Sequence, residues 1–273
     1  MDIIAQIKET TDFLQAKTTI NPAIGIVLGS GLGNLSKEIE IETEIPYSEI
    51  PHFPVSTVKG HSGSLIFGKL SGKNVVAMAG RFHFYEGYDI AQVVFPIRVM
   101  KFLGVDTVVV SNASGGTNPA YSVGDLMIIK DHINLQPKHP LRGKNDERLG
   151  PRFPDMLNAY NPDLITKAQK IADDNKITCH QGVYIGVQGP TFETPAEYKA
   201  FFLLGGDAVG MSTVPEVIAA RHCGLEIFGI SVISDCGYPP EAMEDVSHDM
   251  VVAAAQAAEP QMTLIVKELV AGM

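Results

Sequence analysis

The sequence predicts a single α/β domain spanning residues 1–273, in which helices flank a mixed and largely parallel β-sheet. Short apolar runs bounded by glycine or polar residues recur along the chain, as expected for buried strands. Segments of helical period lie between several of these runs, which is the order typical of an α/β sheet. No internal repeat or clear linker divides the 273 residues, so one domain accounts for the whole chain.

The individual elements follow from the same pattern. Apolar side chains in residues 2–17 share one helical face, and Asn21 and Pro22 end that helix before a buried strand in AIGIVLGSG. Further strands are expected in SLIFGKL, NVVAMAG, DTVVVSN, DLMIIKD, GVYIGVQG, DAVGMS and LEIFGISVIS. Further helices are expected at residues 90–104 and from residues 161, 194, 212 and 245. Pro260 is expected to kink or break the last of them.

The composition limits the classes of protein to consider. With 21 basic and 31 acidic side chains the formal net charge is -10, which disfavours a surface that binds nucleic acid. No apolar run reaches the roughly 20 residues of a membrane span, and the N-terminus lacks the basic residues of a signal peptide. The three cysteines lack CxxC spacing, which disfavours disulfides and a structural zinc site. We therefore expect a cytoplasmic protein with no nucleic-acid or membrane partner.

A glycine turn follows the first predicted strand, in VLGSGLGNL at residues 27–35. A dinucleotide-binding fingerprint needs its third glycine at the position of Asn34, and the lysine of a P-loop is absent. What remains are backbone N–H groups and the Ser30 hydroxyl, which suit one small anion. A simple tight turn is an equally good interpretation of this stretch alone.

The segment GRFHFYEGYD gathers polar side chains at the end of a predicted strand. Arg81 and His83 are two residues apart, so in extended backbone both point to the same side, with Tyr85 at the end of the segment. Arginine offers a planar fork that matches phosphate oxygens, and histidine adds further donors. This spacing favours an anion site over a pair of isolated surface residues.

Two other stretches argue against alternative chemistries. VVVSNASGGTNP runs from a strand into two glycines that allow close backbone approach to a ligand, but the GxSxG spacing around Ser114 is missing, which disfavours a serine hydrolase. Asp131, His132 and His139 match no standard metal-ligand spacing. We therefore expect no metal.

Phe192 and Glu193, in VQGPTFETPAEY, lie between a predicted strand and a helix start. An aromatic ring beside a carboxylate can bind a flat heterocycle, although a helix-capping acid is the likelier interpretation of Glu193 alone. Met211 and Ser212 offer an apolar wall and a hydroxyl before the next helix. The loop at about residues 136–156 is too long for a routine connection and is a candidate binding or interface loop.

These motifs gain specificity from their order along the chain, between about residues 25 and 250: GSGLG, GHSG, GRFHFYEGY, NASGG, GDLMIIKDHINL, GPTFET and GMSTVPEVIAARHCGL. The ordered set resembles the trimeric class of purine nucleoside phosphorylases, which have a phosphorylase/hydrolase-like α/β fold. The resemblance implies a homotrimer for purine salvage. It would cleave purine (deoxy)ribonucleosides of the inosine and guanosine type with inorganic phosphate, giving free base and (deoxy)ribose 1-phosphate, without a cofactor or metal.

The resemblance also implies a role for each candidate residue. The phosphate ligands would be Ser30, His61, Arg81, His83, the backbone at Ala113, and Ser212. The ribose would contact Tyr85, Met211 and His248. The base would contact Phe192, Glu193 and Asp235, with Phe153 closing the site from a neighbouring subunit. The catalytic roles would fall to Glu193, Asp235 and His83.

Asp235 departs from the pattern, because family members that prefer inosine and guanosine usually carry Asn there. An ionised Asp only accepts hydrogen bonds, which suits a 6-amino group, whereas a protonated Asp can donate to the purine N7. Glu193 argues the other way, since its ionised form accepts from the N1–H of inosine. An adenosine- or methylthioadenosine-directed phosphorylase therefore remains an alternative, and a nucleoside hydrolase is a remote one.

Overall fold

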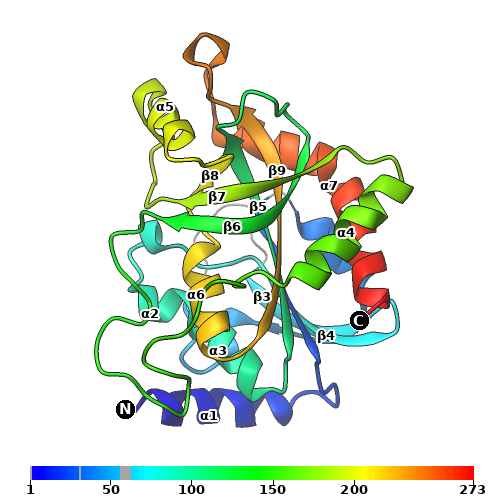
Figure 1. The fold of residues 1–273 in the computed structure, drawn as a ribbon. Helices are drawn as coiled ribbons and strands as arrows, with labels where there is room; N and C mark the ends of the chain where they lie inside the picture. Colours follow the sequence, from blue (N-terminus) through cyan, green and yellow to red (C-terminus); the bar gives the residue numbers. More distant parts are fainter. Residues whose placement is uncertain (1, 31, 56–62) are drawn as a thin grey trace.

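A nine-stranded mixed sheet runs through the residues described by this computed structural model, which are 2–30, 32–55 and 63–273 (Figure 1). The strands are β1 (Ile24–Val27), β2 (Glu40–Pro46), β3 (Ser64–Leu70), β4 (Lys73–Ala79), β5 (Thr107–Gly116), β6 (Leu126–Asn134), β7 (Cys179–Gly186), β8 (Ala208–Gly210) and β9 (Glu226–Cys236). Their order is β2-β3-β4-β1-β5-β8-β7-β6-β9, and β9 also pairs with β5. This arrangement confirms the predicted α/β class and the mixed sheet.

The pairings explain the shape of the sheet. Parallel pairs join β1 to β4 and β5, β5 to β9, and β7 to β6 and β8. Antiparallel pairs join β3 to β2 and β4, β5 to β8, and β6 to β9. Because β5 pairs with both β8 and β9, the strands β5, β8, β7, β6 and β9 form a closed ring. The sequence analysis missed β2, an edge strand in EIETEIP that is largely exposed.

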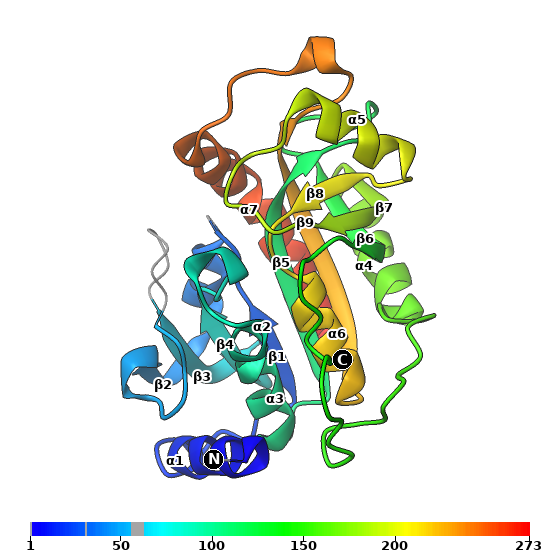
Figure 2. The same ribbon diagram turned by 90° about the vertical axis from the view of Figure 1, so that its left-hand side faces the viewer.

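Helices cover the sheet on both faces (Figures 1 and 2). One core joins the sheet to α1 (Ile3–Gln15), α2 (Ile90–Val93), α3 (Phe95–Phe102) and α6 (Val214–His222). A second core joins it to α4 (Pro162–Asp174) and α7 (His248–Ala271). At the opposite end from α1 lies α5 (Pro195–Leu203), close to the short helix η4 (Pro240–Ala242). None of the helices in the described residues is long and apolar enough to cross a membrane.

The terminal helix α7 corrects one expectation. It runs without interruption through Pro260, so the predicted break at this residue is wrong. Pro260 cannot donate to the carbonyl of Gln256, but both residues are exposed, so water can satisfy that carbonyl. The neighbouring Glu259 is buried and faces the body of the protein instead.

The long parallel pair β5 and β9 and the turn after β1 position the candidate site. Ala113 pairs with Val232 and Gly115 with Asp235, so the carboxyl ends of the two strands lie side by side. The turn after β1 continues into the short helix η1 (Gly33–Glu38). Asn34 donates its backbone N–H and its side-chain amide to Glu259 of α7, at 2.5 and 2.6 Å. The buried carboxylate of α7 thereby fastens the glycine turn.

Candidate active site

One open-mouthed cavity of about 690 Å³ gathers most of the predicted site residues at the carboxyl ends of β1, β4, β5 and β9. The predicted residues that line it are Ser30, Arg81, His83, Tyr85, Ala113, Phe192, Glu193, Met211, Ser212, Asp235 and His248. These residues come from segments spread over most of the chain. His61 lies outside the described residues, and Phe153 lines a different hollow.

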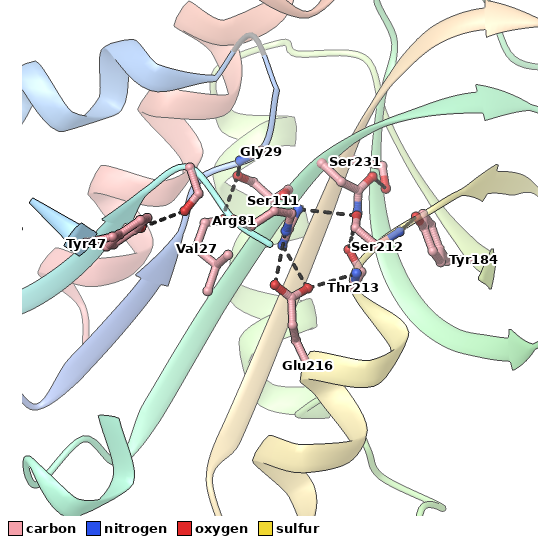
Figure 3. Close-up of polar contacts among 12 residues, drawn as sticks. Val27, Gly29, Tyr47, Arg81, Ser111, Tyr184, Ser212, Thr213, Glu216 and Ser231 are labelled. Atoms are coloured by element: carbon pink, nitrogen blue, oxygen red, sulfur yellow. Dashed lines mark hydrogen bonds and ion pairs between the residues drawn. The ribbon is translucent and has the colours of Figure 1, made fainter. Parts of the chain in front are cut away.

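Arg81 lies at the buried floor of this cavity, with a relative exposure of 1% (Figure 3). Its Nε and Nη2 groups contact the two carboxylate oxygens of Glu216, at 3.1 and 3.0 Å. Its Nη1 group donates to the Ser111 carbonyl at 2.5 Å and to Ser212 Oγ at 3.4 Å. One edge of the guanidinium is therefore held by Glu216, while Nη1 lies beside the hydroxyl of Ser212.

Glu216 holds the first turn of α6 as well as Arg81 (Figure 3). Its Oε2 accepts the backbone N–H of Thr213 at 2.8 Å, in a capping box. Thr213 has a positive φ of 68°, which is uncommon for a residue other than glycine, and its Oγ1 accepts from Asn112 Nδ2 at 2.9 Å. Ser231 in turn donates to Asn112 at 2.8 Å. Buried hydrogen bonds from β5 and β9 thus fix the backbone next to Ser212.

The imidazole of His83 contacts the carboxylate of Glu86. Its backbone is extended, as the strand-end pattern predicted, and its Nδ1 lies 3.0 Å from Oε1 of Glu86. Tyr85 stacks on the imidazole, with ring centroids 4.7 Å apart and planes 15° apart. Burial raises the pKa of Tyr85 to about 12, so its phenol stays protonated near neutral pH. Arg81 and His83, the two residues predicted at the strand end, therefore each contact a carboxylate.

Two carboxyl groups, those of Glu193 and Asp235, also line the cavity. Asp235 accepts from Tyr198 Oη at 2.7 Å on Oδ2, and from Ser234 Oγ at 2.8 Å on Oδ1. Burial raises the pKa of Glu193 to about 7, and the nearby Asp235 adds to the rise. The protonated form of Glu193 is therefore much more accessible near neutral pH than that of an exposed glutamate. Phe192, which lines the cavity beside Glu193, is 42% exposed.

Phe153 lies outside the cavity of its own chain. Its side chain is 86% exposed, with the guanidinium of Arg152 5.7 Å from the ring centroid. It lines a separate hollow with His132 and His139, among other residues of the long loop and β6. Among the described residues no group of three or more His, Cys, Asp or Glu side chains is arranged to hold a metal ion.

Sequence reasoning missed three residues that organise the site: Tyr198, Glu216 and Asn112. Glu216 stands in PEV at a helix start, where its spacing from Thr213 indicates a capping box and nothing more. Its contact with Arg81 spans 135 residues of sequence. Tyr198 lies 37 residues from Asp235 in sequence. Only the tertiary fold brings these pairs together.

Comparison of the chain with known proteins identifies the family to which it belongs. The family model described as the phosphorylase superfamily matches residues 23–271. Purine nucleoside phosphorylase 1 of Geobacillus stearothermophilus is 49% identical over 98% of this chain and 97% of its own length. The chain belongs to the purine nucleoside phosphorylase family. The purine nucleoside phosphorylase of Rattus norvegicus is 47% identical over 96% of this chain and 93% of its own.

Solved structures of the purine nucleoside phosphorylase family share the fold. The Schistosoma mansoni enzyme in complex with adenosine matches with a TM-score of 0.94 and 43% identity, over 99% of this chain and 98% of that chain. The same enzyme in complex with inosine matches with a TM-score of 0.94 and 42% identity, over 99% of this chain and 97% of that chain. Family membership confirms the resemblance that the ordered motifs indicated.

Proposed function

We propose that this chain catalyses the phosphorolysis of purine ribonucleosides and deoxyribonucleosides, giving the free base and (deoxy)ribose 1-phosphate. The observation that carries the proposal is the polarity of the cavity. All five side chains concerned line the same cavity: Arg81, His83 and Ser212 supply hydrogen-bond donors, which we assign to one end, and Glu193 and Asp235 supply carboxyl groups, which we assign to the other. The first end suits a phosphate anion and the second suits the polar edge of a purine.

The sugar would lie between these two ends. Tyr85, Met211 and His248, which line the cavity, would contact the sugar, and Ser30 and Ala113, which also line it, would contact the phosphate. Cleavage of a glycosidic bond passes through a sugar with developing positive charge, so an anion held beneath it stabilises that charge and acts as the nucleophile. The departing purine gains negative charge, so a donor at its N7 lowers the barrier. The scheme needs neither cofactor nor metal.

The base preference rests on two opposed carboxyl groups. Ionised Glu193 would accept from the N1–H of a 6-oxopurine, so inosine and guanosine are the proposed substrates. Asp235 would accept from a 6-amino group, which favours an adenosine- or methylthioadenosine-directed enzyme as the second candidate. A nucleoside hydrolase would leave the donors around Arg81 and His83 without a purpose, so it ranks last.

The exposed Phe153 supports a homotrimer in the proposed cytoplasmic enzyme. Its side chain is 86% exposed and lies outside the cavity of its own chain, on the long loop. Aromatic side chains are enriched at protein–protein interfaces. Phe153 would then complete the base site of a neighbouring subunit.

The first experiment measures initial rates with inosine, guanosine, adenosine and 5'-methylthioadenosine, each with and without phosphate. The proposal expects strict phosphate dependence, with inosine or guanosine as the best substrate. Turnover in phosphate-free buffer would instead identify a hydrolase, and a dominant adenine nucleoside would mean that Asp235 directs the pocket.

Two variants then test the residue roles within that activity. Inosine phosphorolysis should survive Asp235→Asn and collapse with Glu193→Ala. Asp235→Asn keeps an acceptor for Tyr198, so it is the matched control for Glu193→Ala. The reverse pattern would overturn the roles assigned to the two carboxyl groups.

A further inference from the structure

Tyr198 is buried against the base end of the cavity, although it has no role in the scheme above. It is 2% exposed and extends from α5 to the end of β9, where its hydroxyl donates to Asp235 Oδ2 at 2.7 Å. Ser234 donates to the other oxygen at 2.8 Å. Both oxygens of Asp235 therefore accept hydrogen bonds from the protein itself.

The packing around Tyr198 leaves its hydroxyl little freedom. A Cβ added at Gly115 would collide with Tyr198 Oη, and one added at Gly237 would collide with the ring. Both glycines belong to segments that carry the base end of the cavity, since Gly115 lies on β5 and Gly237 follows β9. The absence of side chains at these two positions is what admits the tyrosine. The ring thus fits a slot that aims its hydroxyl at Asp235.

Tyr198 is the donor in its hydrogen bond with Asp235 Oδ2. Burial, with added contributions from Asp235 and Glu193, raises the pKa of Tyr198 far above its ordinary value. The phenol consequently keeps its proton and acts as the donor, while Asp235 is the acceptor. An Asp235 carboxylate held by two donors presents acceptor lone pairs to a ligand, and a 6-amino group is the purine substituent that can donate to them.

We propose that Tyr198 is a positioning residue for base specificity, which holds Asp235 as an acceptor and so raises the acceptance of 6-amino purines in a pocket whose preference for 6-oxo purines rests on Glu193. The inference rests on the proposed function in one respect, namely that the cavity binds purines. It goes beyond that function because it assigns part of the base selectivity to a residue on α5 that makes its contact through Asp235. Without the hydroxyl, Asp235 loses a donor and is less firmly held in the acceptor role.

The test compares equilibrium binding of adenine and hypoxanthine by calorimetry in the wild type and in Tyr198→Phe. We expect the ratio of adenine to hypoxanthine affinity to fall about tenfold, the usual effect of losing a hydrogen bond to a charged group. The same ratio of kcat/KM is measured for adenosine and inosine. A ratio that does not change in Tyr198→Phe overturns the inference.

A second background separates positioning from simple structural support. In Asp235→Asn the carboxylate is gone, so adding Tyr198→Phe should not lower the adenine to hypoxanthine ratio. An equal fall in both backgrounds would mean that Tyr198 only supports the fold, and would overturn the inference. Tyr160→Phe is the matched control, because Tyr160 is also 2% exposed and contacts His132, at 3.1 Å, outside the cavity.

Two further measurements keep the inference falsifiable. If Tyr198→Phe does not fold, Ser234→Ala removes the donor to the other oxygen and should lower the ratio in the same direction. If the ratio of adenine to hypoxanthine affinity does not fall in Ser234→Ala, the role of the donors is contradicted. If the wild type binds both bases but releases no ribose 1-phosphate, the proposed function fails while the binding ratio still decides the role of Tyr198. If it binds neither base, both proposals fail.

Discussion

The two ends of the cavity are organised by opposite electrostatic rules. At the proposed phosphate end a carboxylate lies beside each nitrogen-bearing side chain, Glu216 beside the guanidinium of Arg81 and Glu86 beside the imidazole of His83. At the base end Glu193 and Asp235 are like in charge when ionised, and burial raises the pKa of Glu193 to about 7. Paired charges hold one arrangement, whereas a carboxyl group that titrates near neutrality offers two. In the proposed enzyme this difference would keep the phosphate site fixed while the protonation of Glu193 changes the base preference.

The largest expected effect comes from removing the carboxylate that pairs with Arg81. Glu216→Ala leaves the Arg81 cation buried without its carboxylate, and removing one member of a buried ion pair costs about 3–5 kcal/mol. The free energy of unfolding, measured by urea denaturation, should fall by that amount, and the KM for phosphate should rise. Asp235→Asn is the control at the unpaired end and should change stability by less than about 1 kcal/mol, because its side chain still accepts from Tyr198. Equal losses in the two variants would remove the distinction between the ends.

A smaller effect sharpens the comparison through pH. The pKa of Glu193 rises from 4.5 to about 7 on folding, so the folded state binds more protons than the unfolded state between these values. The contribution of Glu193 to stability is therefore fully present below pH 4.5 and is lost as the pH rises through 7. Relative to Glu193→Gln, the wild type should lose on the order of 1–3 kcal/mol of unfolding free energy from pH 4.5 to pH 8. Parallel stability curves for the two proteins would contradict this.

The same titration should govern the base preference. Only ionised Glu193 accepts from the N1–H of inosine, so kcat/KM for inosine should rise with pH up to about 7, close to tenfold per pH unit on the acid side. Adenosine lacks this proton, so kcat/KM for adenosine should not show the same rise with pH. Rate profiles for the two nucleosides, measured on one preparation, check the prediction. An acid limb of equal steepness for both would assign it to phosphate or to another group.

The smallest effect on the folding of a single chain concerns Phe153. Since this side chain is 86% exposed, Phe153→Ala should change the unfolding free energy of the isolated chain by less than about 0.5 kcal/mol. In the proposed trimer it should raise the KM for nucleosides. Mixed assemblies of Phe153→Ala and Glu193→Ala chains should regain activity, because some sites would combine an intact Glu193 with an intact neighbouring Phe153. No recovery in assemblies shown to be mixed would place Phe153 outside the site.

The sequence predicted the elements of the site better than their contacts. Arg81 and His83 could be placed at a strand end because a continuous apolar run, NVVAMA, marks the buried strand that precedes them. The Glu216 carboxylate could not be assigned to Arg81, since a capping box accounts for it locally and the contact spans 135 residues. The exposed edge strand β2 was missed because it has little apolar surface to bury, and Pro260 was misjudged because an exposed carbonyl tolerates the loss of its donor.

The clamp between Asn34 and Glu259 has a consequence for how the protein is made. The glycine turn that carries Ser30 leaves the ribosome early, but the carboxylate that fastens it belongs to α7 and is translated 225 residues later. Until then the backbone N–H of Asn34 has no Glu259 to receive it. A nascent chain therefore carries an unfastened glycine turn during most of its synthesis, and the lining of the cavity is complete only when α7, which supplies His248 and Val251, docks.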